Sequence, residues 1–157
     1  MKKTYIPSLL VGGLALALSA CVTTPYVAPE SGAVAELAVR ITTAKGTGIK
    51  LYIYDDAETC SGAKTIIDDA GKTNITATKL AAGKLTTFGY DELMGISSCK
   101  VNFSFFPIAD HIYVLDTLTG RRACTTRIVD ATDVNNVLPV PLINRTMNGA
   151  RCAPLKK

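Results

Sequence analysis

The 157-residue sequence contains no tryptophan, and its single histidine is His111. One histidine, with no second histidine or cysteine at ligand spacing, does not make a zinc site. There is no Cys-x-x-Cys pair, and no acidic segment has the spacing of a calcium-binding loop. We therefore expect no metal and no cofactor. The acidic doublets are predicted to be turn residues: Asp55–Asp56, Asp68–Asp69 and Asp91–Glu92.

The sequence also lacks a combination of residues that would perform catalysis. Ser61-Gly62-Ala63-Lys64 matches the Ser-x-x-Lys of penicillin-binding enzymes, but the companion motifs Ser-Asp-Asn and Lys-Thr-Gly are absent. No nucleophile, base and orienting group occur together in a known pattern. We predict that the protein is not an enzyme.

Long helical periods are missing as well, and the dominant pattern is alternation of apolar and polar residues. It is clearest in 99–107, where Val101, Phe103 and Phe105 alternate with polar residues until Pro107 ends the strand. A second extended segment follows in 108–115. This pattern predicts two strands joined by a tight corner, each with one buried face.

Other segments repeat this pattern between turn signals. Segments 33–44 and 49–54 are predicted to pair as a hairpin, and 84–90 as another strand. Segment 91–98 is predicted to be a loop, while the prolines in 137–142 favour an edge strand or polyproline II. Together they predict an all-β protein, an antiparallel β-sandwich of about seven strands.

The first residues have the features of a secretory leader. Lys2 and Lys3 precede the apolar segment 6–18, which is too short for a confident membrane span. The end of the leader, Leu18-Ser19-Ala20-Cys21, resembles the lipobox of bacterial lipoproteins. This resemblance implies that residues 1–20 are removed and that Cys21 is lipidated. The alternative is an ordinary cleavable signal in which Cys21 has no role.

Val22 follows the lipidated cysteine, and the sorting rule of Gram-negative lipoproteins then implies the periplasmic face of the outer membrane. Residues 21–32 are predicted to be a flexible tether, and residues 33–157 to be one domain. Of 17 basic residues, the leader carries two, so 15 remain against 13 acidic ones. This near-neutral balance does not favour nucleic-acid binding.

Once Cys21 is assigned to lipid, four cysteines remain, which in an exported chain predicts two disulfides. Three pairings are possible. We favour Cys60–Cys99 and Cys124–Cys152, because each would tie a strand end to a loop or to the tail.

Two further resemblances concern the fold. Asp110-His111-Ile112-Tyr113, just after Pro107, resembles the tyrosine corner of immunoglobulin-like domains, in which the phenol bonds back to upstream backbone. The alternative is that Tyr113 is an ordinary strand aromatic. The lipobox, Cys99 before a Phe-x-Phe strand and the late cysteines are similar to small Gram-negative outer-membrane lipoproteins. This resemblance implies an immunoglobulin-like or transthyretin-like sandwich and no particular activity.

Three functional hypotheses remain. The first is a structural or protein-interaction role, with the membrane bound through the lipid and another envelope protein as partner. The second is a periplasmic inhibitor of lysozyme or a protease, with segment 91–98 entering the enzyme's cleft. The third is a glycan binder that uses Tyr52, Tyr54 or Tyr90, and it ranks last because tryptophan is absent.

Overall fold

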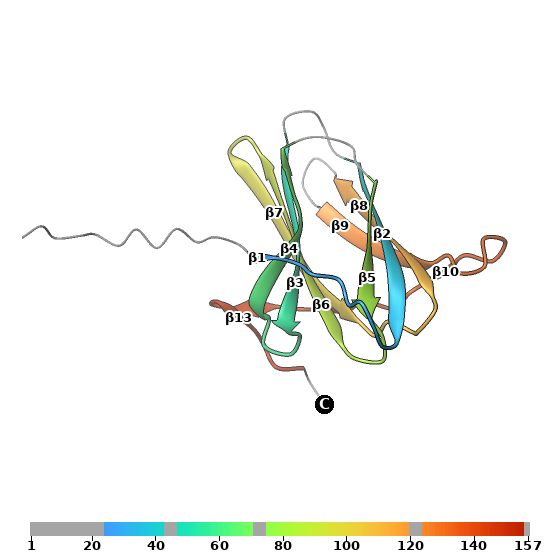
Figure 1. Cartoon of the computed structure of the whole chain (residues 1–157). Coiled ribbons are helices and arrows are strands. Elements are labelled where there is room, and N and C mark those ends of the chain that lie inside the picture. Colours follow the sequence, from blue (N-terminus) through green and yellow to red (C-terminus); the bar gives the residue numbers. More distant parts are fainter. Residues whose placement is uncertain (1–23, 43–46, 71–74, 120–123, 156–157) are drawn as a thin grey trace, which may run out of the picture.

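The computed structural model describes residues 24–42, 47–70, 75–119 and 124–155, and every regular element within these ranges is a strand (Figure 1). The prediction of an all-β protein is confirmed. The longer strands are β2 (Val34–Thr42), β3 (Gly48–Asp56), β4 (Ser61–Ala70), β5 (Ile75–Ala81), β6 (Thr86–Met94), β7 (Ser97–Phe105), β8 (Ile112–Thr119) and β9 (Cys124–Asp130). The short strands are β1 (Thr24–Pro25), β10 (Leu138–Pro139), β11 (Ile143–Asn144), β12 (Met147–Asn148) and β13 (Arg151–Cys152).

The strands form two large sheets that pack against each other. The six-stranded sheet has the order β1-β4-β3-β6-β7-β11, and the five-stranded sheet has the order β10-β9-β8-β2-β5. Phe88, Phe103 and Phe105 of the first sheet stack in the core. Tyr113 of the second sheet packs edge-on against Phe105, with ring centroids 5.2 Å apart. This arrangement fits a β-sandwich.

The strand directions and neighbours differ from the sequence prediction. Both sheets are mixed, because β2 runs parallel to β8 and β1 runs parallel to β4. Segments 33–44 and 49–54 give strands in different sheets, so the expected hairpin is wrong. The described residues contain eight long strands instead of about seven. Alternation identifies a strand and its buried face, but it does not identify the neighbouring strand.

Segment 91–98, predicted to be a loop, is the end of the β6–β7 hairpin. Met94 pairs with Ser97 across a two-residue turn. Gly95 occupies the first turn position with φ of 60°, as a type II′ turn requires. The prediction failed because acidic residues and glycine are depleted in strands, whereas here cross-strand pairing outweighs that preference.

The polar face of β7 is buried over part of its length. Phe103 and Phe105 point into the core as predicted, but Asn102 and Ser104 are buried too. β11 pairs with β7, and the Arg145 N–H donates to the Asn102 carbonyl at 2.9 Å. The C-terminal segment therefore covers a face that the sequence pattern assigned to solvent.

The described part of the predicted tether is attached to the domain. Thr24 and Pro25 form β1 beside β4, and the Tyr26 N–H donates to the Thr65 carbonyl at 2.8 Å. The Tyr26 hydroxyl also donates to the Lys79 carbonyl on β5 at 2.8 Å. These hydrogen bonds hold the chain against β4 and β5 at Thr24, Pro25 and Tyr26.

Candidate functional site

All four domain cysteines form disulfides, but the favoured pairing is wrong. Cys60 is bonded to Cys152, and Cys99 is bonded to Cys124. Cys60 follows the end of β3. Cys99 on β7 pairs with Glu92 on β6, and Glu92 pairs with Ile49 at the start of β3. Seven residues of strand place these two positions roughly 23 Å apart. A disulfide between them is therefore excluded by geometry, while Cys99 on β7 lies close to β9 of the other sheet.

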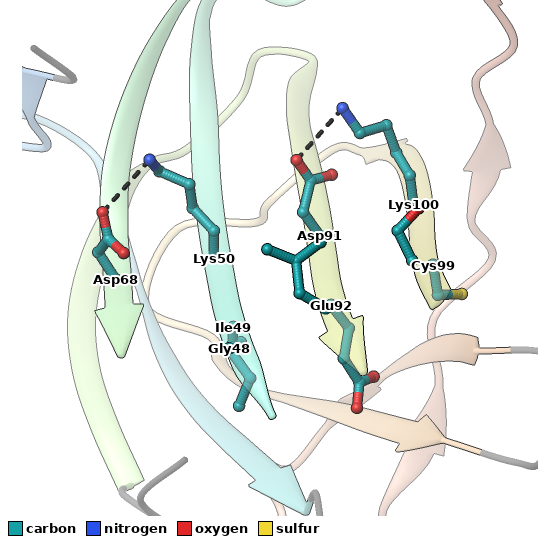
Figure 2. A pocket seen from close by; sticks show the side chains of 10 residues that line it. Gly48, Ile49, Lys50, Asp68, Asp91, Glu92, Cys99 and Lys100 are labelled. Carbon is teal, nitrogen blue, oxygen red and sulfur yellow. Dashed lines mark ion pairs between the residues drawn. The ribbon is translucent and has the colours of Figure 1, made fainter. Parts of the chain in front are cut away.

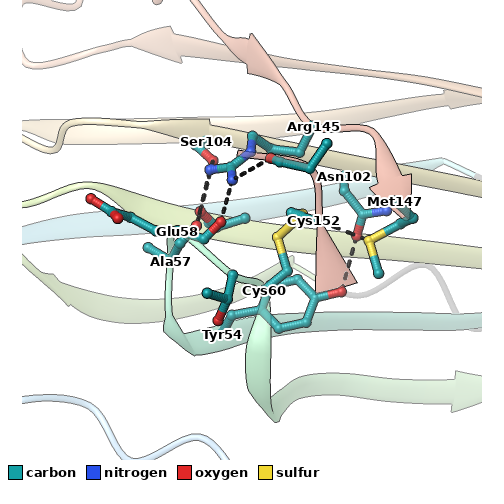
Figure 3. Close-up of a disulfide and its surroundings, with 12 residues drawn as sticks. Tyr54, Ala57, Glu58, Cys60, Asn102, Ser104, Arg145, Met147 and Cys152 are labelled. Atoms are coloured by element: carbon teal, nitrogen blue, oxygen red, sulfur yellow. Dashed lines mark hydrogen bonds between the residues drawn. A yellow bond between two sulfur atoms is a disulfide. The ribbon is translucent and has the colours of Figure 1, made fainter. Parts of the chain in front are cut away.

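Arg145 fixes the C-terminal segment across the six-stranded sheet (Figure 3). Its guanidinium is buried and donates to the carbonyls of Ala57 and Glu58 and to the Ser104 hydroxyl. The Cys60–Cys152 disulfide lies beside it, so the turn between β3 and β4 is held covalently as well as by hydrogen bonds. This cluster has a structural role: it closes one end of the sheet's outer face.

The predicted corner residues lie between the two sheets. Asp110 has φ of 63°, a conformation that aspartate tolerates better than most residues, and its N–H donates to the Val34 carbonyl. The buried Tyr113 hydroxyl accepts a hydrogen bond from the Ile108 N–H at 3.0 Å. The phenol thus bonds to backbone five residues upstream and fixes the passage from β7 to β8.

His111 belongs to the same corner. Its Nδ1 lies 2.5 Å from the Asp130 carboxylate, and its ring stacks on Tyr113. Burial acts to raise the pKa of Asp130, but hydrogen bonds from Thr132 and His111 outweigh burial and lower it. The ionised Asp130 therefore holds His111 against the corner, where the pair links β8 to β9.

The open part of the six-stranded sheet's outer face carries a row of alternating charges (Figure 2). Asp68, Lys50, Asp91 and Lys100 are direct cross-strand neighbours on β4, β3, β6 and β7. Lys50 pairs with Asp68 and Lys100 pairs with Asp91, each at 3.2 Å. They line a pocket of about 430 Å³ that reaches Leu93 near the hairpin end. The charged side chains at the pocket are thus paired with one another.

Two tyrosines extend this face toward the C-terminal segment. Tyr52 donates to Asp91 at 3.2 Å, and Tyr54 donates to Asn102 at 3.1 Å. Burial, together with Tyr54 and Asp91, raises the pKa of Tyr52, so its hydroxyl stays protonated. Tyr90, by contrast, is fully buried in the core, which excludes it from stacking on a ligand.

The hairpin end beside this pocket exposes apolar side chains. Ile96 is fully exposed at the turn, and Leu93 is 59% exposed. The Cys99–Cys124 disulfide fixes β7 to the other sheet two residues beyond the start of that strand. Together, Leu93–Ser98 form what we call the hairpin tip. The hairpin tip exposes apolar side chains, and the disulfide at Cys99 attaches the adjoining part of β7 to the other sheet.

A compact ionic cluster lies on the outer face of the five-stranded sheet. Asp116 is buried between Arg40 and Arg127, and Arg40 binds both of its carboxylate oxygens at 2.6 and 2.9 Å. Burial opposes ionisation, but the hydrogen bonds from Arg40 and Arg127 lower the pKa of Asp116. The cluster ties β2, β8 and β9 together at neutral pH.

No family model and no curated protein matches the sequence. The structure itself defines the class as an all-β protein with two packed mixed sheets and two disulfides. Within the described ranges, no helix is long and apolar enough to span a membrane. No group of three or more potential metal ligands occurs among those residues. Cys21 and the predicted leader lie outside the described residues.

Sequence reasoning missed the residues that shape the open face. Lys50 and Lys100 are 50 positions apart in the sequence, and only the strand order places both beside Asp91. All three acidic doublets lie in strands, in β3, β4 and β6, so their assignment to turns is wrong. Ile96 lies in the segment predicted to be a loop. Gly95, which precedes it, is a residue type that marks a two-residue hairpin turn, so this turn could have been predicted.

Proposed function

We propose that the protein is a lipid-anchored β-sandwich on the periplasmic face of the outer membrane that binds another envelope protein. The lipobox-like leader and Val22 support the anchor and its location. The two disulfides suit an oxidising compartment. The Tyr113 hydrogen bond to upstream backbone favours an immunoglobulin-like type over a transthyretin-like one. The proposal includes no catalytic role.

The hairpin tip carries this proposal. Burial of the exposed Ile96 and Leu93 side chains against a partner would stabilise a complex by about 25 cal/mol per Å² of apolar area. Ile96 is fully exposed, and the Cys99–Cys124 disulfide holds the hairpin in one conformation before binding. A preorganised tip loses less conformational entropy on binding. The adjacent pocket adds Lys50, Asp91 and Lys100 as polar contacts at the rim.

The edge strand β10, which lies in the proline-containing segment 137–142, is poorly suited to strand addition by a partner. It comprises only Leu138 and Pro139, and Pro139 and Pro141 lack the N–H that a new strand would need. The docking surface is accordingly assigned to the hairpin tip.

The test is photo-cross-linking in cells, with a photoactivatable residue at Ile96 and a matched control at Leu118. Leu118 is 51% exposed on the other sheet. The proposal expects one discrete envelope-protein product from position 96, absent from position 118 and lost in a Cys21→Ser background. The same products from both positions, or none from position 96, would contradict it.

Inhibition of lysozyme or a protease is the second candidate, because a braced hairpin with an exposed tip suits insertion into a cleft. It predicts that the purified domain protects peptidoglycan from lysozyme and that Ile96→Asp abolishes this protection. Complete digestion in the presence of excess wild-type protein would remove the lysozyme version.

A further inference from the structure

The position of Thr24 constrains where the domain sits relative to its anchor. β1 is bound to β4, and Tyr26 bonds to both β4 and β5, so the chain is attached to the domain at Thr24–Tyr26. In the sequence, only Val22 and Thr23 separate Thr24 from Cys21. Three residue steps span at most about 10–11 Å when fully extended. This distance is the longest possible separation between the lipidated residue and the domain.

This length is comparable to the thickness of a bilayer's polar headgroup layer. The hydrocarbon core is about 30 Å thick and the whole bilayer about 40–45 Å, so each headgroup layer is roughly 5–8 Å. A cysteine whose acyl chains are inserted lies at the inner border of that layer. Thr24 is therefore held at the membrane surface, and the edge of the sandwich that contains β1 is held there too.

The side chains on this edge suit such a surface. Val27, which is 77% exposed, follows the fixed Tyr26. Lys79 and Lys84 are both exposed: the Lys79 carbonyl accepts the Tyr26 hydroxyl, and Lys84 lines the same small pocket as Tyr26. An apolar side chain beside two lysines matches a layer of anionic headgroups over hydrocarbon. Two acidic residues lie near these lysines: Asp55, which is paired with Lys64 at 2.9 Å, and the exposed Glu36, which is the cross-strand neighbour of Lys79.

We propose that the edge formed by β1, β4 and β5 docks on the anionic phospholipid surface in which Cys21 is anchored. This inference rests on the proposed lipid anchor. β10 lies at the far end of the five-stranded sheet from β5, and Figure 1 shows β1 and β10 on opposite sides of the molecule. The domain thus lies on the membrane with a defined edge, instead of moving freely at the end of a tether.

Because the sequence contains no tryptophan, the fluorescence of a single introduced tryptophan reports on that position alone. Val27→Trp probes the docked edge, and Val134→Trp, at a position that is 79% exposed in the segment leading to β10, is the matched control. Both are prepared as full-length lipidated protein in vesicles of phosphatidylethanolamine and phosphatidylglycerol. Quenching by brominated phospholipid and by aqueous iodide is then measured.

We expect brominated lipid to quench Trp fluorescence several-fold more in the Val27→Trp variant than in the Val134→Trp variant, with iodide giving the reverse order. A flexible insert of about twelve Gly and Ser residues between Val22 and Thr23 should reduce the lipid quenching of the Val27→Trp variant. Lys79→Glu combined with Lys84→Glu should reduce it too.

Vesicle flotation separates this inference from the anchor on which it rests. Wild-type protein that floats while Cys21→Ser does not, together with equal quenching at both tryptophan positions, would overturn the docking but leave the anchor intact. Wild-type protein that does not float would overturn the lipid anchor itself and the docking with it.

Discussion

Tyr52 packs directly onto Gly89, its cross-strand neighbour on β6, and leaves no room for a side chain there. A Cβ on Gly89 would overlap the Tyr52 ring at Cε2, Cζ and Oη. The glycine thus lets the aromatic ring cover the backbone of the adjacent strand, which compensates for glycine's own weakness in a strand. The contact lies on the open outer face of the six-stranded sheet.

Gly89→Ala should therefore destabilise the fold. Overpacking a well-filled position costs about 1–3 kcal/mol, because the ring must leave its position. Gly48→Ala is the matched control on the same face, since its Cβ would meet only Leu93 Cβ at an ordinary 3.8 Å. The free energy of unfolding in urea measures both variants. Equal stabilities for the two alanine variants would contradict the close packing of Tyr52 on Gly89.

This contact also shows how far the sequence predicts the fold. The inward positions of Phe103, Phe105 and Tyr113 follow from period-2 alternation. The neighbours of each strand do not, because the same alternation is compatible with several strand orders and directions. The parallel pairing of β2 with β8, and every contact on the open face, depend on that order. Only the corner around Tyr113, which is local in sequence, has a recognisable signature.

The disulfide pairing has a direct chemical test. Proteolysis without reduction should give one linked pair containing Cys60 and Cys152, and another containing Cys99 and Cys124. Replacing both cysteines of the Cys60–Cys152 pair with serine should lower the free energy of unfolding by about 4.5 kcal/mol. The same replacement in the Cys99–Cys124 pair should lower it by about 3.5 kcal/mol, because that disulfide closes a shorter loop. The separations are 92 and 25 residues. Linked peptides joining Cys60 to Cys99 would contradict the structure.

Removal of the Arg145 guanidinium should abolish the part-buried hydrogen bonds that hold the C-terminal segment to the β3–β4 turn. Arg145→Met keeps much of the side chain's bulk but loses the hydrogen bonds to Ala57 and Glu58. The Ala57 carbonyl keeps the Thr87 hydroxyl as a donor. Because hydrogen bonds from a charged donor contribute about 1.5–3 kcal/mol, we expect a loss of about that size in unfolding free energy. Arg145→Lys should rescue only part, since an ammonium lacks the planar fork. The exposed Arg151→Met is the control and should change stability by less than about 0.5 kcal/mol.

Asp116 should make stability depend on pH in the acidic range. Its pKa in the folded protein is lowered from 3.8, so its ion pairs stabilise the fold fully above the unfolded value. That contribution is lost as the pH falls through the lower, folded value. Wild type should therefore exceed Asp116→Asn in unfolding free energy at pH 7, with a gap that narrows below about pH 4. A constant gap from pH 7 to pH 2 would contradict this assignment.

The ion pair of the exposed Asp68 with Lys50 provides the corresponding control. Asp68 is 62% exposed, and pairs of this kind contribute about 0–1 kcal/mol. Asp68→Asn should consequently change stability little at any pH. Denaturant titrations of the three proteins at a series of pH values make the comparison.

The lipid anchor at Cys21 is central to the proposed function and to the docking, and mass spectrometry of the amino terminus tests this anchor directly. Protein extracted from membranes with detergent should begin at Cys21 and carry a diacylglyceryl group and an amide-linked acyl chain. Cys21→Ser should retain the leader or appear as an unlipidated, soluble form. An amino terminus at any other residue, or an unmodified Cys21 in the mature protein, would contradict the proposed membrane anchor and the docking inferred from it.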